Sequence, residues 1–366
     1  MPQKKLPPVW PITPHTKAKH QILEEYLNAW FPILSRWDKR IVYLDGFAGP
    51  GKYSKGEDGS PVIAINTILH HPMFKKTIEV VFLFIDKDKS RSKILTETLS
   101  EKFSELPSNI KYEITTDNFS SSVKSLLDDL EKDDLNLAPT FAFIDPFGYS
   151  DFPMDLVTRL LNHKKCEVLI NFMSRDINRF RDKTKALDNL FGTPEWRKAN
   201  SIKNTRERID ELLKIYVNEL KKRTGAQFVR TFRMIDSDGK IIYDLVFATK
   251  HHMGMDNMKK AMSKVVRNGI YSFSDNSNPD QTYLFDYVDD LKEENIGSEL
   301  IFDKFKGKTV LDVEIRDFVL ADTPFRKWKP MLKILEKEKP TKIISVSNRK
   351  TKALTYPDGC IVEFGK

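Results

Sequence analysis

The strongest constraint on the fold is a regular alternation of short apolar runs with helix-like stretches over the first 250 residues. Five runs of apolar and β-branched residues each indicate a strand, at 41–44, 80–85, 112–115, 141–144 and 168–172. Alternation of this kind predicts a parallel sheet whose strands are joined by helices. Two later runs, 228–234 and 241–249, flank a turn at 236–239 and predict an antiparallel hairpin. We therefore expect an open, Rossmann-like α/β sheet, although periodicity alone does not separate the doubly wound folds.

Helices are indicated between these strands by apolar spacing and by end signals. Before the first strand, apolar residues recur at helical spacing over 22–34. Ser60 and Pro61 are the residue types preferred at the cap and at the first position of a helix, and another helix is expected to begin near Pro153. Residues 174–226 are charged and mostly helical in pattern, so we expect a helical insertion after the fifth strand.

The polar segment 276–295 has the composition of a boundary between domains. The elements expected after it are a helix, a strand, two helices around the Thr323-Pro324 turn and two strands, at 298–305, 310–313, 315–320, 325–338, 342–346 and 360–364. This order is typical of a winged helix-turn-helix. We thus expect two domains, a Rossmann-like one at 1–275 and a winged helix at 290–366.

Several classes of protein are excluded by composition. Among the 366 residues no apolar run reaches the roughly 18 residues of a membrane span, and the charged start lacks the apolar core of a signal peptide, so a cytoplasmic protein without membrane contact is expected. The only cysteines, Cys166 and Cys360, predict buried thiols and not a disulfide framework. His251 and His252 lack a third ligand at a suitable spacing, so no metal is expected.

The net charge of +8 is concentrated in two segments. Residues 175–230 hold 15 basic and 8 acidic side chains, and residues 321–357 hold 10 and 3. Two basic segments suggest a polyanionic partner such as nucleic acid. The alternative interpretation is that these charges form ordinary solvated helix faces.

An acid and a glycine-rich turn follow the first expected strand, in the sequence Asp45-Gly46-Phe47-Ala48-Gly49-Pro50-Gly51. Glycines let the backbone approach a bound nucleoside closely, and a carboxylate at a strand end can accept hydrogen bonds from hydroxyl or ammonium groups. The simpler alternative is a tight strand-to-helix turn without a ligand.

Acids also follow the second and third expected strands. Asp86, chosen over Asp88, is placed to hold the two hydroxyls of a ribose. Asp117, followed by Asn118 and Phe119, puts a carboxylate and an aromatic ring where an adenine could be bound. Taken singly, each acid could equally be a helix cap. Three acids after three consecutive strands favour a nucleoside site.

The fourth expected strand ends in Asp145-Pro146-Phe147-Gly148. A carboxylate or a backbone carbonyl there can accept the protons of a flat, amine-bearing base, and an aromatic ring can stack on the base. Asn171, at the end of the fifth strand, faces the same cleft in such a sheet. The alternative is a rigid Asp-Pro turn.

The chain resembles the family called three-Cys-motif partner proteins. The resemblance covers about the first 270 residues and is carried by four stretches: His15-Thr16-Lys17-Ala18-Lys19-His20, YLDGFAGPGKY with Gly59-Ser60-Pro61, FIDPFG, and Asn171-Phe172-Met173. The first stretch is expected to lie before the first helix. The resemblance implies a methyltransferase-like sheet and a C-terminal winged helix, and the family's name implies a separate protein with a three-cysteine motif as a partner.

A broader resemblance is to the adenine N6-methyltransferases of RNA and DNA, which use S-adenosylmethionine. It implies a class I methyltransferase sheet in which Asp145, Pro146 and Phe147 are catalytic. Phe147 and Gly148 replace the second proline and the aromatic residue of that family's motif. The residues expected to bind the cofactor are Asp45, Phe47, Gly49, Gly51, Asp86, Asp117 and Asn118.

The winged helix is expected to contact nucleic acid through its second helix and its wing. The cations that would bind phosphates are Arg326, Lys327, Lys329, Lys333, Arg349, Lys350 and Lys352. We therefore expect an S-adenosylmethionine-dependent methyltransferase acting on DNA or RNA. The main rival is a non-catalytic protein that senses S-adenosylmethionine or docks on a partner. A nicotinamide-dependent oxidoreductase is disfavoured because the turn lacks GxGxxG.

Overall fold

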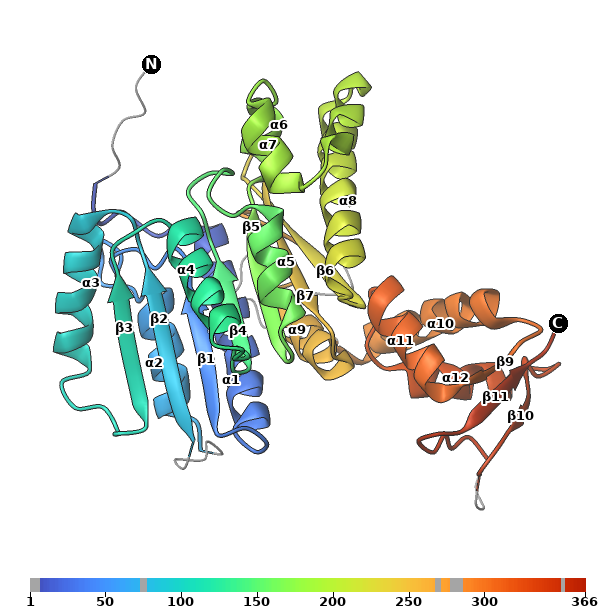
Figure 1. Ribbon diagram of the computed structural model, residues 1–366. Coiled ribbons are helices and arrows are strands. Elements are labelled where there is room, and N and C mark those ends of the chain that lie inside the picture. Colours follow the sequence, from blue (N-terminus) through green and yellow to red (C-terminus); the bar gives the residue numbers. More distant parts are fainter. Residues whose placement is uncertain (1–6, 73–77, 267–270, 277–285, 350–352) are drawn as a thin grey trace. The chain divides into compact units, whose positions relative to one another are not determined.

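The computed structural model describes residues 7–72, 78–266, 271–276, 286–349 and 353–366 (Figure 1). The chain divides into two compact units. The first comprises Met1–Val265 with Ser272–Ser277, and the second comprises Val266–Tyr271 with Asn278–Lys366. Each unit has its own buried core, so each is described separately.

The first unit is built on one eight-stranded sheet with the order β3-β2-β1-β4-β5-β7-β6-β8. Its strands are β1 (Arg40–Asp45), β2 (Glu79–Ile85), β3 (Ile110–Thr115), β4 (Thr140–Ile144), β5 (Cys166–Phe172), β6 (Phe228–Ile235), β7 (Ile241–Thr249) and β8 (Ser272–Ser274). The first five are parallel, and β7 is antiparallel to both β5 and β6. This strand order is that of a Rossmann-like class I methyltransferase sheet, so the fold class expected for the first domain is confirmed. The short strand β8, which pairs with β6, was not expected.

One face of the sheet is covered by α1 (Pro14–Leu34), which packs against α2 (Ser60–Leu69) and α9 (His252–Val265). Tyr26 of α1 contacts the rings of Phe141 and Phe247 on β4 and β7. The helix begins at Pro14, eight residues before the expected start at 22, because Thr13 caps it and accepts the amide of Thr16.

The other face is covered by α4 (Phe119–Lys132), α5 (Met154–Asn162), α7 (Thr184–Phe191) and α8 (Thr205–Thr224). Alternate strand residues point to this side, so that Ala142 and Ile144 join its core while Phe141 faces α1. The expected start of α5 near Pro153 is confirmed, since Pro153 is its N-cap.

The segment between β5 and β6 is helical, and comprises α6 (Ser174–Arg179), α7, the 3₁₀ helix η1 (Pro194–Ser201) and α8. Because α6 begins two residues after β5 ends, this insertion starts at the carboxyl edge of the sheet, where Figure 1 shows α6 and α7. The remaining helix of the sheet's flank, α3 (Lys89–Lys102), joins β2 to β3.

The second unit contains α10 (Asp286–Phe305), β9 (Thr309–Leu311), α11 (Asp312–Asp322), α12 (Trp328–Lys337), β10 (Ile343–Val346) and β11 (Ile361–Phe364). Its three strands form an antiparallel sheet in the order β10-β11-β9. The element order is the one expected from the sequence.

Two helix starts and one strand end differ from the expected positions for clear structural reasons. The helix expected at 298–305 begins at Asp286, so Gly297 lies inside it. A glycine is needed there because α12 packs closely, and a Cβ at this position would be 2.3 Å from Met331. The strand expected at 310–313 ends at Leu311, because α11 begins at the next residue. The amide of Leu311 donates to the carboxylate of Glu314 in the first turn of that helix. The helix expected at 325–338 begins at Trp328, which keeps Pro330 in its first turn, where proline is tolerated.

In the part of the chain that the structure describes, no helix combines the length and apolarity needed to cross a membrane. Cys166 and Cys360 are buried free thiols, as expected.

Candidate active site

A pocket opens at the carboxyl ends of the parallel strands, where ligands bind in open α/β sheets. Its cavity volume is about 80 Å³, and it opens to solvent. Its walls come from the segments after β1, β2, β3 and β4, and the lining residues are Gly46, Phe47, Asp86, Lys87, Arg91, Asp117, Phe119 and residues 146–151. The structure thus brings together residues from three of the predicted strand ends and from the motif after β4.

Asp86 is held at the pocket wall by two backbone amides. Its Oδ2 accepts the N–H of Gly49 at 3.0 Å, and its Oδ1 accepts the N–H of Asp88 at 2.8 Å. Burial raises the pKa of Asp86, against the lowering effect of these bonds. Asp88 has a different part, since its side chain caps α3 by accepting the amides of Ser90 and Arg91. The carboxylate of Asp86 is therefore fixed in orientation and keeps acceptor capacity for a ligand.

The glycine-rich turn has the backbone that its sequence predicts. Gly49 and Gly51 have φ values of 64° and 73°, which a side chain disfavours. A Cβ on Gly51 would also lie 2.7 Å from Leu95 of α3. Gly49 lets the turn fold back so that its amide reaches Asp86, which couples the first strand end to the second.

Asp45 differs from its expected role as a direct cofactor ligand. Its side chain is 0% exposed and does not line the pocket. It accepts the amide of Phe47 at 3.2 Å and the hydroxyl of Tyr43, and it is bonded to Ser60. Burial raises its pKa to about 7. Asp45 therefore stabilises the glycine-rich turn after β1 through buried hydrogen bonds, instead of facing the pocket.

Ser60 was expected to cap α2, which was wrong. Gly59 is the N-cap, and Ser60 is the first residue of the helix. The hydroxyl of Ser60 is bonded to Asp45, so it serves the turn after β1 instead of the helix end.

Two aromatic rings form the floor beside the third strand end. Phe47 and Phe119 are stacked, with centroids 5.6 Å apart and an interplanar angle of 24°. Gly46 leaves room for them, since a Cβ there would be 2.4 Å from the ring of Phe119. Asp117 is exposed at the pocket edge, whereas Asn118 is the N-cap of α4 and is not part of the lining, contrary to expectation.

Asp145, at the end of β4, is held on both carboxylate oxygens. Oδ2 accepts the ammonium of Lys19, and Oδ1 accepts the amide of Asn171 at 2.6 Å. Lys19 and Asn171 are buried, whereas the side chain of Asp145 is 21% exposed. The carboxylate is therefore fixed by two buried donors. Asp145 is not itself part of the pocket lining, whereas the next residue, Pro146, is.

The stretch from His15 to His20 lies in the first turns of α1, not before the helix as expected, because the helix begins at Pro14. Lys19 consequently points inward, with its ammonium 5.4 Å from the ring centroid of Tyr243. Its neighbour His20 is also buried, and burial together with the charge of Lys19 lowers the pKa of His20 to about 3. His20 is thus neutral at physiological pH.

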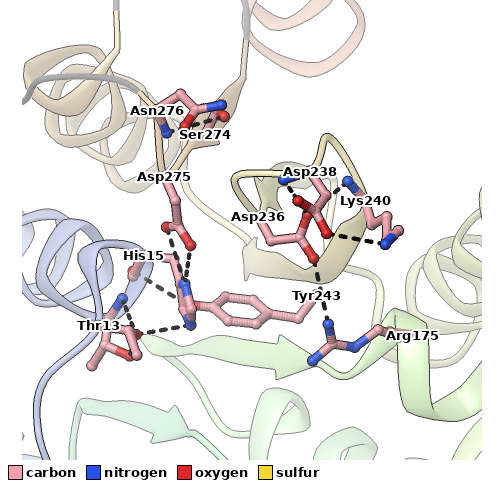
Figure 2. A network of polar contacts seen from close by, with 11 residues as sticks. Thr13, His15, Arg175, Asp236, Asp238, Lys240, Tyr243, Ser274, Asp275 and Asn276 are labelled. Carbon is pink, nitrogen blue, oxygen red and sulfur yellow. Dashed lines mark hydrogen bonds and ion pairs between the residues drawn. The ribbon is translucent and has the colours of Figure 1, made fainter.

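Figure 2 shows how the start of α1 is fixed. Nδ1 of His15 donates to the carboxylate of Asp275, whose two oxygens lie at 3.0 and 3.1 Å, and Nε2 forms a hydrogen bond with the hydroxyl of Thr13 at 2.8 Å. The hydroxyl of Tyr243 donates to the carbonyl of His15 at 3.2 Å. Tyr243 therefore contacts both His15 and Lys19, one helical turn apart, and sets the direction of the helix that carries Lys19.

Trp10 and Arg91 are site residues that sequence reasoning missed. The guanidinium of Arg91 lies 5.1 Å from the ring centroid of Trp10 and 4.7 Å from that of Phe147, and the two rings meet edge to face at 5.1 Å. Phe147 remains 51% exposed. The sequence signals that could have identified them are a tryptophan in the proline-rich start of the chain and an arginine five residues after Asp86. Their packing fixes Phe147, the third residue of the predicted catalytic motif.

The cations expected on the winged helix are not equivalent. Arg349 is bonded through Nη1 and Nη2 to Glu336, at 2.5 and 2.9 Å, so it braces α12 instead of pointing outward as expected. Lys329 pairs with the exposed Asp358 at 2.9 Å, and Lys333 is exposed on α12. Arg326 and Lys327 precede the helix, contrary to expectation. Lys350 and Lys352 lie outside the described residues.

Within the described ranges, no three histidine, cysteine, aspartate or glutamate side chains are grouped as metal ligands. His251 and His252 stack on each other with centroids 4.4 Å apart.

No model of a protein family matches the sequence, and no curated protein does. Solved structures with a similar chain path include protein LPL1258 from Legionella pneumophila, which is 12% identical, with 64% of this chain and 84% of that chain covered and a TM-score of 0.38. The methyltransferase domain of bacterial CtHen1 is 10% identical, with 62% and 99% covered and a TM-score of 0.32. The plantazolicin methyltransferase BpumL, solved with SAH, is 10% identical, with 65% and 87% covered and a TM-score of 0.33.

These TM-scores are below 0.5, so the fold class rests on the strand order of the sheet. The resemblance to three-Cys-motif partner proteins and to adenine N6-methyltransferases stays a prediction.

Proposed function

We propose that the protein is an S-adenosylmethionine-dependent methyltransferase that acts on an exocyclic amine of nucleic acid, such as N6 of adenine. The observation that carries the proposal is the fixed carboxylate of Asp145 at the end of β4, since the next residue, Pro146, lines the pocket at the strand ends. A methyltransferase needs such an arrangement, because the bound methyl donor and the amine that accepts the methyl group must lie next to each other.

The residues of the pocket fit an adenosyl cofactor. Asp86 presents a carboxylate at the end of β2, where ribose hydroxyls are bound in folds of this class. Asp117 is exposed at the next strand end, and the stacked rings of Phe47 and Phe119 offer an apolar surface for a flat base. When bound, the cofactor supplies an electrophilic methyl group on a sulfonium.

Asp145 would orient the acceptor amine. Its carboxylate accepts an N–H of the amine, so that the nitrogen lone pair is directed toward the pocket, and the carbonyl of Pro146 can accept the second N–H. Lys19 and Asn171 hold the carboxylate in this orientation and balance its charge. Phe147, supported by Trp10 and Arg91, provides an exposed ring on which a base can stack.

The preference for nucleic acid is supported by charge and by the second unit. The chain carries two basic segments, and the element order of the second unit is that of a winged helix-turn-helix. Lys333 is exposed on α12, so its ammonium is accessible to a phosphate, whereas Arg349 is bonded to Glu336 within the unit.

A second candidate function is a non-catalytic S-adenosylmethionine sensor that docks on nucleic acid or on a three-Cys-motif protein. The observation that favours it is the bond between Lys19 and Asp145, because the ammonium occupies one oxygen that an acceptor amine would approach. In this case the cofactor pocket is retained and transfer is lost.

Two measurements test these proposals. Isothermal titration with S-adenosylmethionine, S-adenosylhomocysteine and NAD should give binding of the first two and no binding of the third. Transfer of a labelled methyl group to total RNA and to DNA, followed by nucleoside analysis, then separates an enzyme from a sensor. Binding of S-adenosylmethionine without transfer to either polymer would favour the sensor, and no binding would contradict both proposals.

A further inference from the structure

Arg181 and Arg208, in the insertion between β5 and β6, share one acceptor. Nη1 of Arg181 donates to Oδ1 of Asn178 at 2.5 Å, and Nε of Arg208 donates to the same oxygen at 2.7 Å. Nη1 of Arg181 also donates to the backbone carbonyl of Asn178. The two guanidinium groups therefore lie within a few ångström of each other around a neutral amide.

Neither arginine forms an ion pair with a carboxylate in the described part of the chain, in contrast to other arginines of the insertion. Arg197 is paired with Asp188 at 2.6 Å, and Arg223 is paired with Asp155 and Glu219, each at 3.1 Å. Burial and the charge of Arg208 lower the pKa of Arg181, as expected for two cations without a counterion.

The unused donors of the pair form a suitable edge for an anion. A guanidinium has five N–H donors. Arg208 is braced by the carbonyls of Ile202 and Lys203 and by the hydroxyl of Thr205. Arg181 uses only Nη1 in the bonds described above, so its Nε and Nη2 remain as the parallel pair of donors that binds phosphate oxygens in a bidentate manner. Both side chains are partly exposed, which gives an anion access.

The pair is linked to the candidate active site through one aromatic contact. Phe180, next to Arg181, stacks on Tyr149 with centroids 5.7 Å apart and an interplanar angle of 25°. Tyr149 lines the pocket beside the Asp145-Pro146-Phe147 motif. Arg179 adds a third cation, whose guanidinium lies 5.1 Å from the ring centroid of Phe180.

We propose that Arg181 and Arg208 bind a backbone phosphate of the nucleic acid whose base enters the pocket. The proposal rests on the proposed function for the nature of the substrate, and it places a phosphate contact in the first unit, outside the winged helix. The insertion then fixes the register of the strand, while Asp145 acts on the base.

The test is a salt titration of nucleic-acid binding by the full chain, with Arg181→Gln as the main variant. Its probes are a fluorescently labelled 30-nucleotide RNA and a DNA duplex of the same sequence, without cofactor. Arg181→Gln should weaken binding of the preferred probe about 3- to 10-fold and reduce the slope of log K against log salt by about 0.7–0.9, the value for one lost phosphate contact. Arg181→Lys should recover most of the slope but not the full affinity, because an ammonium lacks the bidentate fork.

Arg197→Gln is the matched control, since it removes the same charge from the same insertion where the arginine is already paired. It should leave the slope unchanged. Equal slopes for Arg181→Gln, Arg197→Gln and the wild type would overturn the proposal, as would a wild-type chain that binds neither probe. Because binding is measured without methyl transfer, a chain that shows the expected slopes but transfers no methyl group supports this proposal and contradicts the proposed activity.

Discussion

The ammonium of Lys19, in the second turn of α1, is bonded to the carboxylate of Asp145 at the end of β4, across 126 positions of the sequence. The lysine is 4% exposed, and its ammonium also faces the rings of Phe143 and Tyr243. A buried ammonium needs a counterion, and Asp145 provides it. The pair thus connects the N-terminal helix to the residue that we propose orients the acceptor.

Replacing Lys19 should lower turnover more than binding. Lys19→Met keeps the length and the apolar packing of the side chain but leaves Asp145 with Asn171 as its donor, so the carboxylate loses its fixed orientation. We expect kcat to fall about 10- to 100-fold, equal to about 1.4–2.7 kcal/mol of activation free energy, with the affinity for S-adenosylmethionine within about 3-fold. Steady-state kinetics and titration measure both quantities. Lys17→Met, at an exposed position of the same helix, is the control, and an equal loss in both variants would contradict the role of Lys19.

Replacing Asp86 should weaken cofactor binding, whereas replacing Asp88 should mainly lower the stability of the fold. Asp86→Ala removes the carboxylate from the pocket wall and frees the amide of Gly49, so the affinity for S-adenosylmethionine should fall at least about 10-fold. Asp88→Ala removes the cap of α3 and should cost about 1 kcal/mol of stability with little change in affinity. Titration calorimetry and urea unfolding check the two results. Unchanged affinity in Asp86→Ala would show that the cofactor site lies elsewhere.

Asp45 should make the protein less stable as the pH rises. Its pKa is raised from 3.8 to about 7 by burial, so between these values the folded chain binds a proton that the unfolded chain has released. Stability therefore decreases from pH 4 to pH 7 and no longer changes on this account above pH 7. Asp45→Asn keeps the shape and lacks this titration, so its stability relative to the wild type should increase by about 1–3 kcal/mol between pH 5 and pH 8.

Urea unfolding at the two pH values measures this difference directly. Other titrating groups are common to both proteins, so their contributions cancel in the comparison. A difference between Asp45→Asn and the wild type that is the same at pH 5 and pH 8 would mean that Asp45 is ionised throughout this range.

Arg349 should matter for the stability of the second unit. Burial raises the pKa of Glu336, but the bonds from Arg349 and Tyr356 outweigh it and hold the pKa below its ordinary value. Arg349→Met leaves this carboxylate, 16% exposed, without its bidentate partner, at an expected cost of about 1–3 kcal/mol. Calorimetry should show a lower unfolding temperature, and Lys333→Met, on the exposed side of the same helix, should not. Equal unfolding temperatures in the two variants would contradict this account of Arg349.

The sheet could be predicted because its strands are short runs of apolar and β-branched residues, and β4, β5 and β7 are buried along their whole length. All seven predicted strands of the first unit differ from the observed ones by at most two residues at either end. β8 was missed because Ser272–Ser274 is short and polar and is stabilised by pairing with β6. The start of α1 was missed because the apolar stripe begins at Ala18, after a first turn defined by Thr13 and Pro14.

For the site, the sequence located the strand ends but not the partners of their side chains. Asp86 and Asp117 face the pocket as predicted, since parallel strands place their carboxyl ends at one edge. The residues next to Asp45 and Asp86 in the sequence do not show that Asp45 is buried inside the fold whereas Asp86 lines the pocket. The bonds of Arg349 to Glu336 and of Lys19 to Asp145 depend on tertiary packing. The basic pattern alone therefore assigned Arg349 to the nucleic-acid surface, and Lys19 was expected before the first helix.

The most direct test of the central claim compares the wild type with Asp145→Ala in methyl transfer from labelled S-adenosylmethionine to total RNA and to DNA. We expect labelled N6-methyladenosine with the wild type and a loss of at least about 100-fold with Asp145→Ala, while both proteins bind S-adenosylmethionine with affinities within a few fold. Asp145→Ala that transfers methyl groups at the wild-type rate would contradict the claim that this carboxylate orients the acceptor amine.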